Sequence, residues 1–136
     1  MTRLPDWPDR LSVLVARAHT QLFTWGSHDC CMWAADAVQA LTGHDPAADL
    51  RGRYADAPSA MHTLRAVGGL LGAGRRTGVR LAGPGYARDG DVALVHDGRR
   101  PMLAVRVGDV WMAAATRGLM ALPTGAARMA WGVGHG

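Results

Sequence analysis

The chain has 136 residues, of which 49% are hydrophobic, and a formal net charge of +4. This length fits one compact core, so residues 1–136 are expected to form a single domain. All 15 basic residues are arginine and no aromatic residues are interleaved with their clusters, which argues against nucleic-acid binding. No apolar run is long enough for a membrane span, and residues 1–10 lack the apolar stretch of a secretory signal.

Two amphipathic helices are predicted in the first third of the chain. Asp6 or Asp9 can cap the first, whose apolar positions recur at helical spacing from residue 11 to residue 22. The second is predicted to begin at Cys30, directly after a histidine and an aspartate, and to end before the turn residues TGHDP (42–46).

A third helix is predicted to begin at Asp56 and to run through Val67, where two glycines close it. The segment before it, DLRGRY (49–54), is expected to be a shaped loop in which Arg51 or Arg53 pairs with an acid. The glycine-rich segment 70–86 is predicted to be a loop with at most one short element.

The periodicity changes to that of strands near residue 90. The dipeptides DG, GD and RG provide turns between the first four of five predicted strands, which are 91–96, 102–107, 110–116, 119–123 and 128–133. Helices followed by a meander of short strands predict an α+β domain, with N-terminal helices packed on one C-terminal antiparallel β-sheet.

The stretch WGSHDCCMWAAD (25–36) holds both cysteines, at the predicted start of the second helix. A thiol in the first turn of a helix lies near the positive end of the helix dipole, which lowers its pKa and favours the nucleophilic thiolate. Cys30 is therefore the candidate nucleophile. The structural alternative is that Cys30 and Cys31 are small buried residues at a helix–sheet contact. Two adjacent cysteines do not form a disulfide framework, so both thiols are expected to be free.

A metal site is the other alternative for this stretch. Zinc ligands prefer spacings such as C-x-x-C, whereas adjacent helical residues point about 100° apart. No metal and no cofactor are therefore predicted for the candidate ligands, which are His28, Asp29, Cys30, Cys31, His44 and Asp45.

The order of three motifs resembles the NlpC-type cell-wall cysteine peptidases, a papain-like family. These motifs are FTWG (23–26), HDCC (28–31) at a helix start, and GDVALV (90–95) leading to a hairpin. More narrowly, residues 25–54 look like small phage and prophage proteins of this fold that are encoded among tail genes. The resemblance extends from about Phe23 to Val133. It implies an NlpC-type fold, Cys30 as the nucleophile, and Cys31 in the place of the family's serine.

The sequence departs from this family where the other polar groups of the site are expected. Met102 falls on the family's catalytic histidine, and methionine cannot accept a proton. The third, orienting residue should fall within 112–114, which holds nothing polar, and Phe23 stands where a tyrosine is common. These departures predict a fold whose catalysis has decayed.

Two histidines could replace the missing base. His96 ends the strand 91–96 and is either a relocated base or a solvated residue at a hairpin tip. His28 lies two residues before Cys30 and either contacts the thiol or caps and packs the helix. Without a base, roughly 10²- to 10⁴-fold of general acid–base assistance is lost, so little or no peptidase activity by the family mechanism is expected.

Two functions remain open. The first is a degenerate NlpC-type structural protein of a phage tail tip that packs on hub and tip proteins, with Trp7, Trp111 and Trp131 available to partners if exposed. The second is an active cysteine peptidoglycan hydrolase that uses Cys30 with His96 or His28. In either case we expect a protein made in the bacterial host cytoplasm and carried in the virion, with peptidoglycan as a further candidate partner, no nucleic acid and no membrane span.

Overall fold

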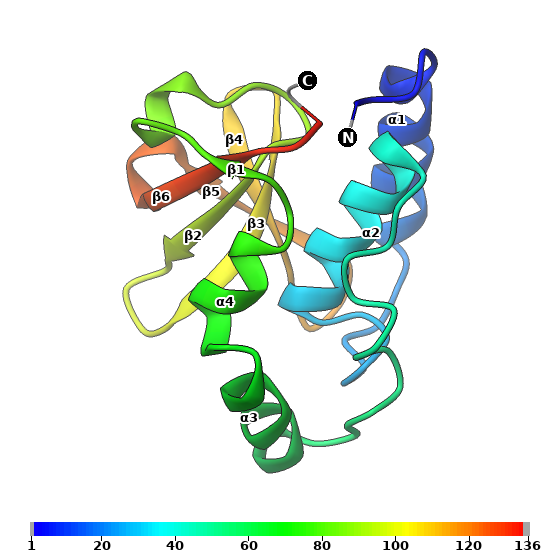
Figure 1. The fold of residues 1–136 in the computed structure, drawn as a ribbon, viewed down its shortest axis with the longest axis vertical. Coiled ribbons are helices and arrows are strands. Elements are labelled where there is room, and N and C mark those ends of the chain that lie inside the picture. Colours follow the sequence, from blue (N-terminus) through cyan, green and yellow to red (C-terminus); the bar gives the residue numbers. More distant parts are fainter. Residues whose placement is uncertain (1, 135–136) are drawn as a thin grey trace.

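The structure, a computed structural model, describes residues 2–134 and is an α+β domain (Figure 1). The described elements are, in chain order, α1 (Trp7–Ala18), α2 (Cys30–Thr42), α3 (Ala57–Ala66), α4 (Gly69–Arg75), β1 (Val79–Arg80), the 3-10 turn η1 (Pro84–Tyr86), β2 (Val92–His96), β3 (Pro101–Val107), β4 (Val110–Ala114), β5 (Leu119–Pro123), the 3-10 turn η2 (Thr124–Ala126) and β6 (Ala127–Gly132).

The six described strands form one sheet in the order β1-β6-β2-β3-β4-β5, and every neighbouring pair is antiparallel. Strands β2 to β5 form the predicted meander, with Gly98, Gly108 and Gly118 at positive φ in its turns. The chain then returns, so that β6 pairs with β2 on the side away from β3. The prediction of helices followed by an antiparallel sheet is confirmed.

The helices cover one face of the sheet, α2 and α4 by direct contact and α1 by packing on α2. Helix α2 packs on β3 and β4, α1 packs on α2, and α4 packs on β2 and β3 (Figure 1). Helix α3 extends from α4 at the lower end of the molecule in that view. The start of α2 therefore lies between the sheet and the pair α3 and α4, which places Cys30 where three parts of the fold meet.

The first helix is shorter than its apolar spacing predicts. It ends at Ala18, and Leu22 is 57% exposed and forms an isolated antiparallel bridge with Arg117. The next residue, Phe23, donates its N–H to the carbonyl of Thr116. The chain leaves the helix because this segment is held beside the β4–β5 turn, a contact that no local pattern encodes.

The prediction of a loop over residues 70–86 is wrong, because this segment contains most of α4, then β1 and η1. Glycine disfavours helix, but here tertiary packing decides. Ala73 is buried, and a Cβ on Gly74 would lie 2.3 Å from the Trp131 ring, so only glycine lets α4 approach the sheet this closely.

Both faces of the sheet carry buried apolar side chains. The helix-facing core includes Trp33, Val38, Leu41 and Trp131, and the opposite face buries a smaller cluster around Trp111. Trp111 and Trp131 are buried and offer no surface to a partner, so of the three tryptophans considered from the sequence only Trp7, which is half-buried, is accessible.

Candidate functional site

Helix α2 begins at Cys30, as predicted, and Asp29 caps it. One Asp29 carboxylate oxygen accepts the Met32 N–H at 2.9 Å; the other accepts the Gly26 N–H at 2.9 Å and the Tyr54 hydroxyl at 2.8 Å. Asp29 is 2% exposed. The aspartate of the HDCC motif therefore fixes the backbone that presents Cys30, and burial beside this carboxylate raises the pKa of Tyr54.

Gly26 closes the loop in front of the helix. Its φ is +80°, and a Cβ there would lie 2.6 Å from the carbonyl oxygen of Tyr54. The loop 26–29 can pack against Tyr54 only because this position carries no side chain. The FTWG stretch thus contributes a conformational requirement to the site.

The two adjacent thiols occupy different surroundings. Both are free, Cys30 being half-buried and Cys31 buried, and their Sγ atoms lie 4.0 Å apart. Two hydrogen bonds, first the one with Cys31 and then one with the backbone of Leu103, lower the pKa of the Cys30 thiol. The positive charge of Arg100 lowers it further. The same bond, together with burial, raises the pKa of Cys31. Cys30 is therefore the more nucleophilic of the two.

Cys30 opens into a pocket of about 420 Å³ between α3, α4, the start of β3 and the segment before α2. This volume is in the range of small-ligand pockets. Its described lining residues are Phe23, Trp25, Cys30, Ala57, Ala60, Met61, Leu64, Arg65, Gly69, Leu70, Arg100, Pro101, Met102 and Ala114. The walls are thus apolar except for the thiol and two arginines.

The residues at which the resemblance led us to expect a base and its orienting partner, Met102 and Ala114, lie at this pocket. Pro101, Met102 and Ala114 all line it, and Met102 is 3% exposed. Phe23 also lines it and packs edge-on against Trp25, with ring centroids 4.8 Å apart. The surroundings of the Cys30 thiol are apolar where a base and its orienting partner would be needed.

His96 is the last residue of β2 and pairs in register with Pro101. Its Nδ1 accepts the Gly98 N–H at 3.0 Å, so the ring closes the β2–β3 turn. Among residues 2–134, no hydrogen bond joins it to Cys30, and it is not one of the residues that line the pocket.

His28 is buried, and its ring is directed to a different part of the fold. Its Nε2 donates to the Gly118 carbonyl in the β4–β5 turn, at 3.3 Å. Its Nδ1 has no hydrogen-bond partner among the described residues. The structure therefore brings neither histidine into hydrogen-bond contact with the thiol.

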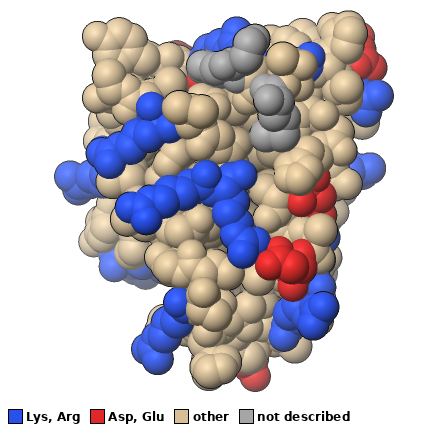
Figure 2. All heavy atoms as spheres, in the orientation of Figure 1, with Lys and Arg blue, Asp and Glu red and all other residues tan. Residues whose placement is uncertain are grey.

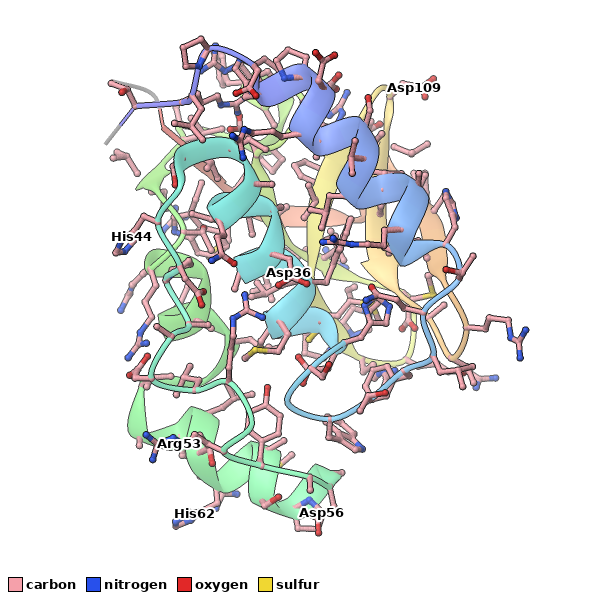
Figure 3. The ribbon with its side chains drawn as sticks, turned by 90° about the vertical axis from the view of Figure 1, so that its right-hand side faces the viewer. Asp36, His44, Arg53, Asp56, His62 and Asp109 are labelled. Carbon is pink, nitrogen blue, oxygen red and sulfur yellow. The ribbon has the colours of Figure 1, made fainter. Side chains whose placement is uncertain are left out.

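The acid partner expected for the loop 49–54 is found. Arg51 bonds Asp36 of α2 and Asp45, each at 2.7 Å, which ties the loop to the helix. Burial raises the pKa of Asp36, and Figure 3 places this residue on the side of α2 that is turned toward α1. The same view shows His44 and His62 at the edge of the molecule, His44 just after the end of α2 and His62 on α3.

No group of three or more His, Cys, Asp or Glu side chains that could hold a metal ion gathers within residues 2–134. In the same part of the chain, no helix has the length and apolar character needed to cross a membrane. Figure 2 shows arginine side chains at several places on this face, some of them next to one another and one next to an acidic side chain.

Sequence reasoning missed the arginines of the pocket. Arg65 lies in the last turn of α3 and Arg100 in the β2–β3 hairpin, 35 positions apart in the chain. No motif marks either residue. The only signal was the GRRP cluster (98–101), which alone does not indicate that one of its arginines faces Cys30.

Comparison with known families gives one match. A family described as "Domain of unknown function (DUF6950)" matches residues 2–133, nearly the whole chain. None of the curated proteins matches.

Proposed function

The chain belongs to the DUF6950 family, whose description names no activity, and we propose from the Cys30 site that it is a non-catalytic, NlpC-type papain-like domain. In this proposal it serves as a structural protein of a phage tail tip and packs on tail hub and tip proteins. It is made in the host cytoplasm and assembled into the virion.

One observation supports the proposal that the domain is not catalytic. Pro101, Met102 and Ala114 line the pocket beside the Cys30 thiol, and no described lining residue is a histidine. A cysteine peptidase needs a base that takes the thiol proton and later protonates the leaving amine. Apolar side chains at these positions do neither, so the site supports binding rather than bond cleavage.

The tail-tip role rests on the resemblance of residues 25–54 to small phage tail-associated proteins. The pocket is compatible with this role because its apolar walls continue to the outer surface at Met61, which is 58% exposed. Contiguous exposed apolar surface commonly marks a protein–protein contact.

The proposal is tested in two steps. Wild type, Cys30→Ala and His96→Ala are incubated with peptidoglycan and with stem peptides, and the products are analysed by mass spectrometry. We expect no cleavage by any of them. Purified virions are then analysed by mass spectrometry, where we expect this chain in fixed proportion to the tail proteins. Its presence only in lysate would overturn the structural role.

The second candidate is an active cysteine peptidoglycan hydrolase, and a specific observation favours it. Cys30 begins a helix, its pKa is lowered, and its thiol borders a pocket. In this case wild type cleaves and Cys30→Ala does not. If His96→Ala is also inactive, His96 is the base; if His28→Ala is inactive instead, His28 takes that role.

A further inference from the structure

The Cys30 pocket combines an apolar interior with positive charge from two elements. Arg65 comes from α3 and Arg100 from the β2–β3 hairpin, and the described residues that line the pocket include no carboxylate. Among residues 2–134, the ion pairs of the molecule involve Arg3, Arg10, Arg51 and Arg76, so neither guanidinium at the pocket is paired with an acid. The pocket therefore lacks the negative charge that would complement it.

We propose that this pocket binds a short segment of a partner protein in which a large apolar side chain stands next to a carboxylate. The apolar side chain fills the space between Trp25, Leu64 and Met102, above the Cys30 thiol. The carboxylate meets Arg65 or Arg100, each of which can offer paired N–H donors to it.

The extent of the apolar surface argues for a protein segment. Met61 of α3 lines the pocket and is 58% exposed, so the apolar surface of the pocket extends to its outer rim at this residue. A peptide covers both the pocket and this rim, whereas a small amphiphile would leave the rim in water. Anchoring by one large apolar side chain in a pocket, surrounded by weaker contacts, is the usual energetic arrangement of protein interfaces.

This inference rests on the proposed function only in taking the pocket as a binding site and not as a place of bond cleavage. The proposed function and this inference can be overturned independently of each other. A chain that is absent from virions but still selects such segments overturns the tail-tip role alone, whereas a chain that is present in virions and selects no such segment overturns this inference alone.

The test is a selection of displayed random heptapeptides on the full-length protein, followed by fluorescence anisotropy with the enriched peptides. We expect sequences that place Leu, Met, Phe or Trp beside Asp or Glu. The double variant Arg65→Gln/Arg100→Gln should weaken binding about tenfold, as expected for loss of a charge-assisted contact. The matched control Arg17→Gln/Arg53→Gln removes the same charge from exposed positions outside the pocket and should bind like wild type.

Alkylation of Cys30 locates the bound peptide. A peptide seated in the pocket should slow the reaction of Cys30 with iodoacetamide, whereas the same peptide with Asp and Glu replaced by Asn and Gln should not at equal concentration. Sodium decanoate tests a small amphiphile. Three results would overturn the inference: no enrichment of acidic apolar sequences, unchanged affinity in Arg65→Gln/Arg100→Gln, or protection of Cys30 by decanoate and not by the peptides.

Discussion

Cys30 and Cys31 are neighbours in the chain with opposite chemical roles. Cys31 is buried in the helix-facing core, whereas Cys30 borders the pocket. The contact between their sulfur atoms lowers the pKa of one thiol and raises that of the other. Cys31 is therefore a buried core residue, whereas the Cys30 thiol is the one that borders the pocket.

The effect of Cys31 on Cys30 can be measured by alkylation. The thiolate is the reactive form, so a lowered pKa moves the pH midpoint of Cys30 alkylation to lower pH. Cys31→Ala removes the hydrogen bond that is the largest cause of this shift, and the midpoint should then move to higher pH. Iodoacetamide rates between pH 6 and 10 give both curves, with Cys30→Ala as the control for slow reaction at buried Cys31. Identical midpoints in wild type and Cys31→Ala would contradict the assignment.

Substitution of Gly26 tests whether the loop before α2 requires glycine at this position. Gly26→Ala places a side chain at φ +80° and a Cβ 2.6 Å from a backbone oxygen, so both strain and a clash result. Left-handed backbone alone costs a non-glycine residue about 1–2 kcal/mol. We expect urea denaturation to give a loss of at least that size. Gly85→Ala is the control, since its added Cβ meets nothing within 4 Å. Equal stability of the two variants would disprove the close approach.

At the scale of elements, α2 and α3 are each capped by an aspartate, but the two aspartates have different surroundings. Asp29 and Asp56 both cap through a carboxylate oxygen that accepts the backbone N–H three residues on. Asp56 is exposed and forms a capping box with Ser59. Asp29 is buried and holds two more donors, so it organises the loop and Tyr54 as well as the helix.

Alanine substitution should show that the two capping aspartates contribute differently to the free energy of unfolding. Asp29→Ala loses a cap worth about 1 kcal/mol and leaves the buried Gly26 N–H and Tyr54 hydroxyl unpaired, at about 1–3 kcal/mol each. We expect a total loss of at least about 3 kcal/mol in the free energy of unfolding. Asp56→Ala should lose clearly less. Tyr54→Phe removes one donor and keeps the cap, so its loss should be intermediate. Equal losses for both aspartates would show that burial of Asp29 adds nothing.

At the scale of the whole molecule, Asp91 joins the two ends of the described chain. Its carboxylate accepts from Arg3 at 3.0 Å and from the N–H groups of Arg88 and Val133 at 2.9 Å each. Arg3 also donates to the carbonyl of Val133. Its guanidinium lies over the Trp7 ring, with the Cζ atom 4.3 Å from the ring centroid. The Gly-Asp pair (90–91) directly before β2 thus has a structural role.

Removal of this buried carboxylate should destabilise the fold strongly. Asp91→Ala leaves the guanidinium of Arg3, whose pKa burial already lowers, without its ionic partner. Breaking one side of a buried pair costs about 3–5 kcal/mol. Chemical denaturation measures the loss, with Asp6→Ala as the control because the Asp6–Arg10 pair is exposed and should contribute little. A small loss for Asp91→Ala would mean that the two ends are held by apolar packing instead.

The sequence by itself determined the elements whose signals are local. Helix α2 is delimited by an aspartate cap before Cys30 and by Gly43, in the left-handed region, after Thr42. Glycine turns separate the strands of the meander. Such signals act between residues a few positions apart, so the printed sequence contains them in full. The position of Cys30 at a helix start followed from them.

Only the tertiary structure decided which distant residues meet. Helix α4 forms in a glycine-rich segment because Trp131, about 60 positions away, packs on Gly74. His28 turns to Gly118 and His96 to its own hairpin, while two arginines from separate elements reach the pocket over Cys30. These contacts depend on how the helices pack on the sheet, and packing selects partners by shape and burial, which residue types and spacing do not specify.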